Sequence, residues 1–269
     1  METKQPLLEM EHINKSFGAV CALQDVSFRI YPGEAVGLVG DNGAGKSTLV
    51  KIISGVEHPD SGIIRFDGKE VVIRTPEEAR HMGIETLYQD LALINNLDIV
   101  ANMFLGRELV QRWPFGLVNI LRNREMEVEA TSILDRLKIN MGSVREKVEV
   151  LSGGQRQAIA LGRAVGWGKR LVLLDEPTAA LGVREAQQGL EIIGRLRDEG
   201  IASVIISHNL EHVFSVVDRI VVIRRGVMRG ERLIGEAKGD EIVSMITGVA
   251  ELRNLEFGVG DSASRPSAP

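Results

Sequence analysis

The chain has 269 residues, 44% of them apolar, and a formal net charge of −5 at pH 7. This length suits one large domain or a domain with a subdomain, and the acidic balance argues against a nucleic-acid binder that works through a broad basic face. No apolar run reaches the roughly 18 residues that a membrane-spanning helix needs, and the N-terminal residues lack the apolar core of a secretory signal. Cys21 is the only cysteine, which excludes an internal disulfide and a cysteine-based zinc site. We expect Cys21 to pack as a small apolar residue, in a protein of the reducing cytoplasm.

The first segments lead into a glycine-rich loop. Residues 8–17 and 26–30 alternate apolar and polar side chains, which predicts half-exposed strands. Residues 35–39 are continuously apolar, which predicts a buried strand, and residues 40–48 then fit the pattern G-x-x-x-x-G-K-[ST]. A helix is expected directly after the loop, because apolar residues recur along one helix face at Leu49, Ile52 and Ile53.

The loop at residues 40–48 has the composition of a phosphate cradle, the P-loop. Its glycines let the backbone wrap an anion, and its amides and the helix N-terminus point at phosphate oxygens. Lys46 supplies a positive charge to the β- and γ-phosphates of a nucleotide, and Ser47 supplies a hydroxyl to Mg²⁺. The residues predicted to bind the nucleotide here are Gly40, Asp41, Asn42, Gly43, Ala44, Gly45, Lys46, Ser47 and Thr48.

An antiparallel β layer beside this core is predicted by a hairpin signal. Residues 63–66 and 70–73 flank Asp67-Gly68, a dipeptide that favours a tight turn between two strands. Residues 84–88 then predict a strand that leads into Gln89. The neutral amide of Gln89 is expected to contact Mg²⁺ or water and to sense whether a γ-phosphate is present.

Residues 90–167 change to a helical character. The clearest amphipathic piece is residues 127–137, and Pro114 and Gly116 interrupt the pattern. We therefore expect a helical subdomain, at about residues 91–167, inserted into the core. The predicted fold class is α/β: a P-loop NTPase core of mixed sheet and flanking helices, with an antiparallel β subdomain and an inserted helical subdomain.

Two acids follow the apolar strand predicted at residues 171–175. Asp175 is expected at the carboxyl end of that strand, where ligands bind in open α/β sheets, and a carboxylate there can complete the Mg²⁺ shell. Glu176 beside it can polarise an attacking water. His208 follows another predicted strand, residues 201–206, and can hydrogen-bond a γ-phosphate. Each of these residues alone is more often structural or surface-exposed, but their occurrence together downstream of a P-loop favours a catalytic interpretation.

The C-terminal part is predicted to complete the core with a helix and a hairpin, and its last residues have no apolar periodicity. Residues 184–199 predict a helix that ends at Gly200, and the segments on either side of Arg225-Gly226 predict a closing hairpin. Residues 257–269 have no apolar period, and we expect a disordered tail there.

The most specific signal is the run Leu-Ser-Gly-Gly-Gln at residues 151–155, which precedes a predicted helix. A serine and two glycines at a helix N-terminus make a second anion-binding surface. The chain therefore carries two phosphate-binding surfaces and a single P-loop. A two-fold dimer resolves this, because the surface of one copy can close over the ATP held by the P-loop of the other.

Together these motifs resemble the ATP-binding cassette (ABC) transporter ATPases. The resemblance covers roughly residues 7–250, as a single ABC ATPase domain, and its motifs are Phe17, residues 40–48, Gln89, residues 151–155, residues 171–176 and His208. It implies that the chain hydrolyses ATP with Mg²⁺, and that the metal is held by Ser47, Gln89 and Asp175. It also implies that Phe17 stacks on adenine.

The same resemblance implies the remaining roles. Glu176 would be the general base, His208 the switch histidine, and Lys46 a third catalytic group. The residues implied to bind the γ-phosphate held by the partner copy are Ser152, Gly153 and Gly154, and Gln155 and Gln89 are also implied to be ATP-binding residues. Two positions depart from the family pattern: Gly182 stands where an Asp is usual, and Asn209 stands where an acid is common.

Residues 91–108 are similar to bacterial monosaccharide importers of the ribose, xylose and fructose kind, and the sequence around Gly182 is similar to the fructose type. With one cassette and an intact set of motifs, the resemblance implies a homodimer with two competent sites. It implies integral membrane permease subunits as partners, a periplasmic or extracellular sugar-binding protein as an indirect partner, and no nucleic acid. The location implied is peripheral, at the cytoplasmic face of the membrane.

Alternatives remain open from the sequence. A soluble ABC ATPase that acts on ribosomes or DNA usually has paired cassettes, long coiled-coil insertions or basic arms, and none of these features is seen. A nucleotide-gated regulatory module that hydrolyses little ATP would not need Glu176. An importer ATPase for a solute other than a sugar also fits the motifs.

Overall fold

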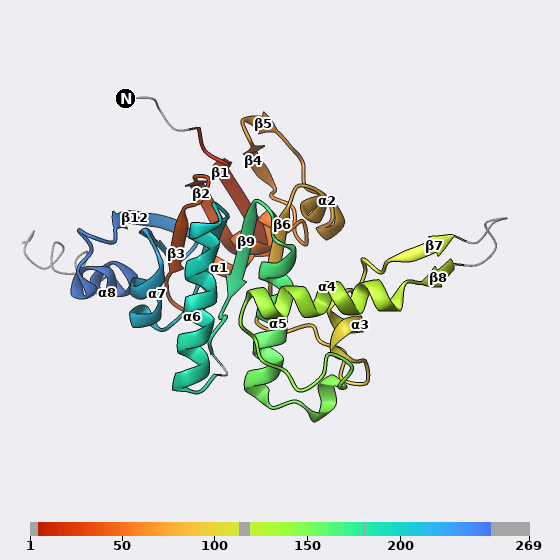
Figure 1. Cartoon of the computed structure of the whole chain (residues 1–269). Coiled ribbons are helices and arrows are strands. Elements are labelled where there is room, and N and C mark those ends of the chain that lie inside the picture. The colour runs from red at the N-terminus through yellow and green to blue at the C-terminus, as the bar shows by residue number, and fades with distance from the viewer. Residues whose placement is uncertain (1–4, 113–118, 180, 249–269) are drawn as a thin grey trace, which may run out of the picture.

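The computed structural model describes residues 5–112, 119–179 and 181–248, in which a six-stranded sheet is the centre of the fold (Figure 1). Its strand order is β12-β11-β3-β10-β9-β6. The strands run parallel, except that β12 pairs antiparallel with β11. This mixed sheet consists of β3 (Ala35–Val39), β6 (Ile84–Leu87), β9 (Leu171–Asp175), β10 (Ala202–Ile206), β11 (Arg219–Arg224) and β12 (Val227–Leu233).

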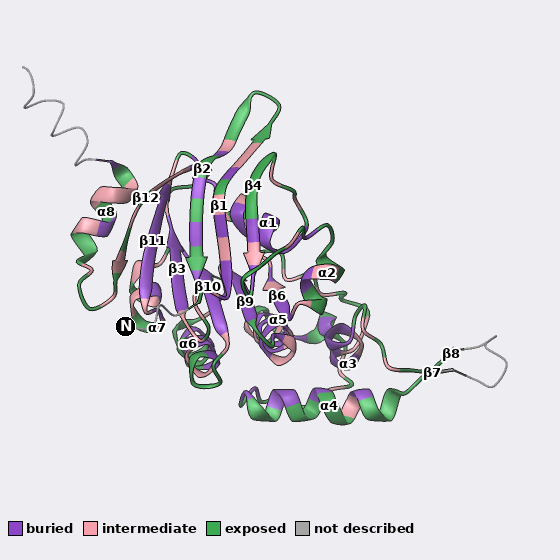
Figure 2. Ribbon diagram, turned by 90° about the horizontal axis from the view of Figure 1, so that it is seen from above, coloured by how far each residue is buried: buried purple, intermediate pink, exposed green. Residues whose placement is uncertain are grey.

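A four-stranded antiparallel sheet lies against one face of this core, with helix α1 (Lys46–Ile53) packed between them in a shared apolar cluster. Residues 26–30 alternate buried and exposed, as their sequence predicts, and Figure 2 shows this as bands along β2. The strand order is β2-β1-β4-β5, with β1 (Leu8–Phe17), β2 (Val20–Ile30), β4 (Ser61–Phe66) and β5 (Lys69–Glu70).

The central strands are almost entirely apolar because both of their faces are buried. In β3, Val36 and Leu38 pack toward α1 and the antiparallel sheet, whereas Ala35 and Val39 pack toward the helices on the opposite face. A strand that is covered on both sides is a nearly continuous apolar run. The remaining core helices are α2 (Pro76–His81), α5 (Gly153–Trp167), α6 (Val183–Asp198), α7 (Leu210–Val216) and α8 (Gly239–Thr247).

The block between β6 and β9 is mainly helical, with α3 (Ile99–Met103), α4 (Asn123–Arg136), a 3₁₀ turn (Val148–Val150) and α5. A small hairpin, β7 (Val110–Arg112) and β8 (Asn119–Leu121), interrupts it and projects from the body of the protein (Figure 1). The sequence predicted no strands in this block. Pro114 and Gly116, the predicted interruption, lie outside the described residues.

Two local predictions were wrong. Residues 71–73 are not part of a strand: the chain leaves β5 after Glu70, because Ile73 turns into the apolar cluster beside α1 on its way to α2. Cys21 does not pack in the interior but is exposed next to the turn of the β1–β2 hairpin. The predicted tail, residues 257–269, lies outside the described residues, and the domain limits 7–250 and 91–167 stay predictions.

None of the helices in the described ranges is long and apolar enough to cross a membrane.

Candidate functional site

The loop at residues 40–48 joins the end of β3 to α1. Gly45 shows why this turn requires glycine: its φ is +108°, and a Cβ there would lie 2.6 Å from the carbonyl oxygen of Ala22. The Lys46 Nζ donates hydrogen bonds to the carbonyl oxygens of Gly40 at 2.7 Å and Asp41 at 2.9 Å. These bonds hold the ammonium group against the first residues of its own loop.

Carboxylates gather beside this ammonium group. Burial lowers the pKa of Lys46, while the charges of Glu176, Asp175 and Asp41 oppose that shift. Asp175, at the end of β9, is 8% exposed and accepts a hydrogen bond from the Ser47 hydroxyl at 3.4 Å. Burial, and next the charge of Glu176, raise the pKa of Asp175, against the Ser47 hydrogen bond and the charge of Lys46. Two carboxylates in a partly buried place therefore favour an additional cation.

Glu176 and His208 meet at the ends of neighbouring parallel strands, β9 and β10. The His208 ring nitrogen Nδ1 lies 2.9 Å from Glu176 Oε2, and the backbone N–H of His208 donates to Glu176 Oε1 at 3.0 Å. The Ser207 hydroxyl donates to the same carboxylate at 3.5 Å. The carboxyl edge of the sheet therefore brings together an acid and a histidine that are 32 residues apart in the sequence.

One cavity of about 580 Å³ collects most of the predicted site residues. It is lined by the P-loop from residue 42 to residue 48, together with Gln89, Asp175, Glu176 and His208. Gly40 and Asp41 take part through the carbonyl groups that hold Lys46. The side chain of Gln89 comes from the end of β6, at the edge of the sheet, so three strand ends and the P-loop surround one space.

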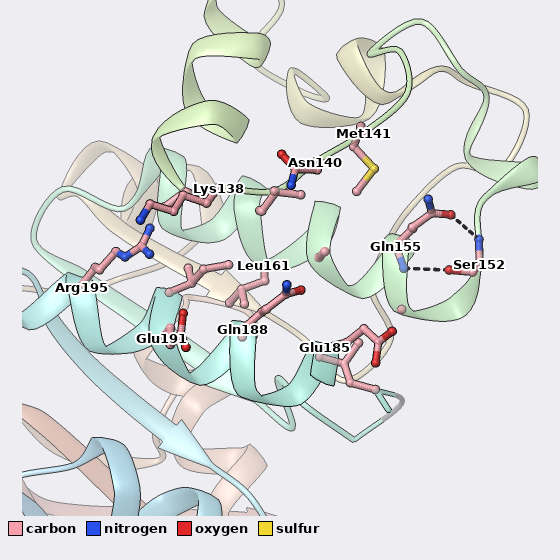
Figure 3. A pocket seen from close by; sticks show the side chains of 17 residues that line it. Lys138, Asn140, Met141, Ser152, Gln155, Leu161, Glu185, Gln188, Glu191 and Arg195 are labelled. Atoms are coloured by element: carbon pink, nitrogen blue, oxygen red, sulfur yellow. Dashed lines mark hydrogen bonds between the residues drawn. The ribbon is translucent and has the colours of Figure 1, made fainter. Parts of the chain in front are cut away.

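The run at residues 151–155 forms the start of α5 and lies on a different cavity. Ser152 caps this helix: its hydroxyl accepts from the Gln155 N–H at 3.2 Å, and its own N–H donates to Gln155 Oε1 at 2.9 Å (Figure 3). Ser152, Gly154 and Gln155 line a cavity of about 400 Å³ between α5 and α6. Within one copy of the chain, the two predicted phosphate-binding surfaces do not share a cavity.

Phe17 also stands outside the P-loop cavity. It ends β1 with 46% exposure, and the Lys15 Nζ lies 5.1 Å from the centre of its ring. The cavity wall near it comes from residues that the sequence did not single out, namely Val20, Cys21 and Ala22, while Ala179 and Ile206 contribute elsewhere. For Val20, Cys21 and Ala22, the only feature of the sequence that could have indicated a place at the site is that they lie close to Phe17 along the chain.

The two departures from the family pattern have local explanations. Asn209 is the N-cap of α7, and its side chain accepts from the His212 N–H at 3.2 Å, a task that Asn performs as well as Asp. Gly182 is the N-cap of α6, and a Cβ at this position would lie 2.7 Å from Glu185 Oε2. The Glu185 carboxylate thus occupies space that a larger residue at position 182 would need.

Among the described residues, no group of three or more His, Cys, Asp or Glu side chains is arranged to hold a metal ion. A cation in the P-loop cavity would depend instead on the mixed oxygen donors of Ser47, Asp175 and Gln89, completed by phosphate oxygens and water. Mg²⁺ is the ion that accepts such a set, since it binds few protein oxygens and retains water or phosphate ligands.

A family model described as ABC transporter matches residues 23–179. The chain belongs to the ABC transporter family. It is therefore an ABC ATPase, whose activity is ATP hydrolysis coupled to transport.

Relatives and a solved structure agree with this ABC assignment. The chain is 47% identical over 244 residues to a xylose/arabinose import ATP-binding protein of Sulfolobus acidocaldarius, which covers 91% of this chain and 95% of the relative. It is 46% identical over 225 residues to a fructose import ATP-binding protein of Rhizobium meliloti, covering 83% and 86%. A crystal structure of the ADP conformation of an ABC transporter cassette superposes with a TM-score of 0.75 at 25% identity, covering 94% and 99%. The predicted α/β cassette fold is confirmed.

Proposed function

We propose that this ABC ATPase drives the uptake of a monosaccharide through a membrane permease. Its ATPase chemistry is supported by the cavity in which the P-loop, Gln89, Asp175, Glu176 and His208 meet. The choice of a sugar is supported by the two relatives, which are import proteins for xylose/arabinose and fructose and are matched over most of their length.

ATP binds with its phosphates against the P-loop amides and Lys46. The ammonium group exchanges its contacts with the Gly40 and Asp41 carbonyls for phosphate oxygens, which are stronger, charge-assisted partners. Ser47, Asp175 and Gln89 would hold Mg²⁺, which would neutralise charge on the phosphates. The adenine ring stacks on Phe17, which is exposed and available for that contact.

Hydrolysis uses Glu176 as the general base. Glu176 accepts a proton from a water molecule, the water oxygen attacks the γ-phosphorus, and the bond to the β-phosphate oxygen breaks to leave ADP and phosphate. His208 orients the Glu176 carboxylate through its ring nitrogen and its backbone N–H. Its other ring nitrogen then faces the γ-phosphate.

Two copies of the chain are needed to complete each site. The start of α5 offers amides and a helix N-terminus for an anion but lines its own cavity, away from the P-loop of the same copy. In a head-to-tail homodimer, Ser152, Gly153, Gly154 and Gln155 close over the γ-phosphate held by the other copy. Hydrolysis then depends on dimer closure.

The permease docks on the helical block near the segment that follows Gln89. Between α3 and α4 a cavity of about 390 Å³ has an apolar floor that includes Val100, Phe104 and Met126, with Glu127 and Arg145 at its rim. Such a concave apolar surface with a polar rim suits a short helix of a partner. The chain is then peripheral, at the cytoplasmic face of the membrane, and a sugar-binding protein acts on the permease from the opposite side.

Uptake measurements in the cells that carry this gene test the proposal. We expect deletion to abolish uptake of one labelled sugar among xylose, arabinose, fructose and ribose. The wild-type chain and a variant at an exposed lysine, Lys69→Ala, should restore it, whereas Lys46→Ala, which loses the phosphate contacts, should not. Unchanged uptake of all monosaccharides after deletion would overturn the sugar assignment, and a ribosome or DNA defect in its place would favour the soluble alternative.

A further inference from the structure

The three residues Glu176, Pro177 and Thr178 follow β9, and the first of them has an unusual backbone conformation. Glu176 has a φ of +53°, in the left-handed region that residues with a side chain seldom adopt. Such a conformation persists only where the surroundings impose it, and it re-aims the side chain that it carries. The direction of the Glu176 carboxylate is therefore decided by whatever fixes the backbone of these three residues.

Gln157, in the second turn of α5, fixes them from one side. Its side chain is 3% exposed, and its Nε2 donates to the carbonyl oxygen of Pro177 at 2.7 Å and approaches that of Glu176 at 3.4 Å. A buried carbonyl needs a donor, and the amide of Gln157 supplies it to the Pro177 carbonyl. A buried glutamine amide held on two successive carbonyls defines the orientation of that backbone.

α7 fixes the same residues from the other side. The Thr178 hydroxyl, on a residue that is 6% exposed, lies 3.1 Å from the His212 ring nitrogen Nδ1. The backbone N–H of Glu176 donates to the Ile206 carbonyl oxygen, in β10, at 2.9 Å. The backbone is thus tied to α5, to α7 and to β10 within three residues.

We propose that Gln157 is a positioning residue, which aims the carboxylate of Glu176 by holding the carbonyl oxygens of Glu176 and Pro177, given the role proposed above for Glu176 as the general base. Because α5 begins at the Ser152 cap, the same helix carries the surface that meets the partner's nucleotide and the amide that orients the base. Movement of α5 as the dimer closes is thereby transmitted to Glu176 in the same copy of the chain.

The first test is the full-length variant Gln157→Leu, which keeps nearly the same volume but cannot donate a hydrogen bond. We expect kcat for ATP hydrolysis to fall about 10- to 100-fold, since a displacement of about 1 Å in a reacting group can cost about 100-fold. The affinity for ATP should stay within about twofold, because the P-loop contacts are unchanged. Gln187→Leu, at an exposed position of α6, is the matched control and should retain full kcat.

A double-variant comparison separates positioning from a general effect on α5. If Gln157 acts through Glu176, adding Gln157→Leu to Glu176→Gln should cause little further loss of the residual turnover, and ATP-induced dimerisation should be as strong as in Glu176→Gln alone. A multiplicative loss or a failure to dimerise would overturn the proposal and assign Gln157 to the integrity of α5. Wild-type kcat in Gln157→Leu would also overturn it.

A different result would overturn the assignment of Glu176 as the general base without testing the positioning role of Gln157. If Glu176→Gln alone kept the wild-type rate, Glu176 would not be the base, whatever Gln157→Leu did. If Gln157→Leu unfolds below the assay temperature, Gln157→Asn is used, which keeps the amide but falls short of the Pro177 carbonyl by one methylene. The same loss of kcat at constant ATP affinity is expected there, and full activity would contradict the positioning role.

Discussion

Replacement of Glu176 by glutamine isolates the chemistry of the proposed base from the shape of the site. The amide is isosteric with the carboxylate, so its oxygen can still accept from the His208 N–H, now found at 3.0 Å, and its NH₂ can donate to the His208 ring or to the Ser207 hydroxyl. The backbone at Glu176 is held by groups that the substitution does not touch. We therefore expect the fold and the cavity of Glu176→Gln to be unchanged.

We expect Glu176→Gln to lower the rate of ATP hydrolysis only through the loss of proton transfer from water. A general base contributes about 10²- to 10⁴-fold to a rate, which corresponds to about 3–5 kcal/mol of activation free energy. Binding should not weaken, because Lys46 and Ser47 keep their positions and one negative charge near the phosphates is removed. The same change removes a charge that raises the pKa of Asp175, so this carboxylate becomes easier to ionise and a better ligand for Mg²⁺.

Three measurements on the purified chain check this prediction. Phosphate release should fall to about 1% of wild type or below, fluorescent ATP should bind with equal or higher affinity, and light scattering should show a dimer that persists with ATP. Glu70→Gln, at an exposed position of β5, should behave as wild type in all three. Phosphate release by Glu176→Gln at the wild-type rate would refute the reasoning, and so would a large loss of ATP affinity.

Three further predictions concern charge and stability. The Arg219 side chain is 9% exposed, and its Nε lies 2.8 Å from Glu34 Oε1. Arg219→Met should cost about 3 kcal/mol, because it leaves the Glu34 carboxylate without its ion-pair partner and with only the Tyr31 N–H as a donor. Calorimetry should show that adding Glu34→Gln recovers part of this loss; no recovery would contradict the pairing. The raised pKa lets Asp175 keep its proton to higher pH in the native protein than in the unfolded chain, so the free energy of unfolding falls as the pH rises above 3.8. Without nucleotide, Asp175→Asn should therefore melt at a higher temperature than wild type at pH 7.5, but not below about pH 4. A gain in melting temperature that did not depend on pH would contradict this. Gly182→Asp should gain nothing in urea unfolding beside the Glu185 carboxylate, whereas Gly182→Asp added to Glu185→Gln should gain a few tenths of a kcal/mol over Glu185→Gln alone, because Gly is already a fair helix cap. An equal gain from Gly182→Asp alone would show that the two carboxylates do not compete.

Parts of the site that are contiguous in the sequence could be predicted from it. The P-loop is recognisable because the turn at Gly45, the ammonium of Lys46 and the following helix all lie within a dozen residues. Asp175 and Glu176 follow the same logic, since an apolar strand followed by two acids marks the carboxyl edge of a parallel sheet. The prediction for Cys21 was wrong because its exposure does not depend on a contiguous pattern. It depends on how far the β1–β2 hairpin extends beyond the neighbouring strands.

The meeting of distant residues could not be derived from local patterns. His208 reaches Glu176 because β10 lies beside β9, and strand order in a sheet is set by crossover connections that leave no periodicity in the sequence. The resemblance to a known family supplied that information for His208 and Gln89. It supplied none for Gln157, whose partner is a backbone carbonyl that any residue at position 177 would offer.

The helix α5 connects three parts of the site through contacts at three positions along its length. Its cap, Ser152, belongs to the surface proposed to meet the partner's γ-phosphate, and Gln157 holds the backbone beside the base. Farther along, Arg163 donates to the carbonyl oxygens of Leu91 at 2.9 Å and Ala92 at 3.0 Å, in the segment directly after Gln89. Burial lowers the pKa of the Arg163 guanidinium, and backbone carbonyls provide its hydrogen bonds there. Ser152 and Arg163 are separated by about 16 Å along a rigid helix, at 1.5 Å per residue. A displacement at the cap therefore reaches the base and the Gln89 segment together, so dimer closure, activation of water and contact with the permease are expected to change as one step.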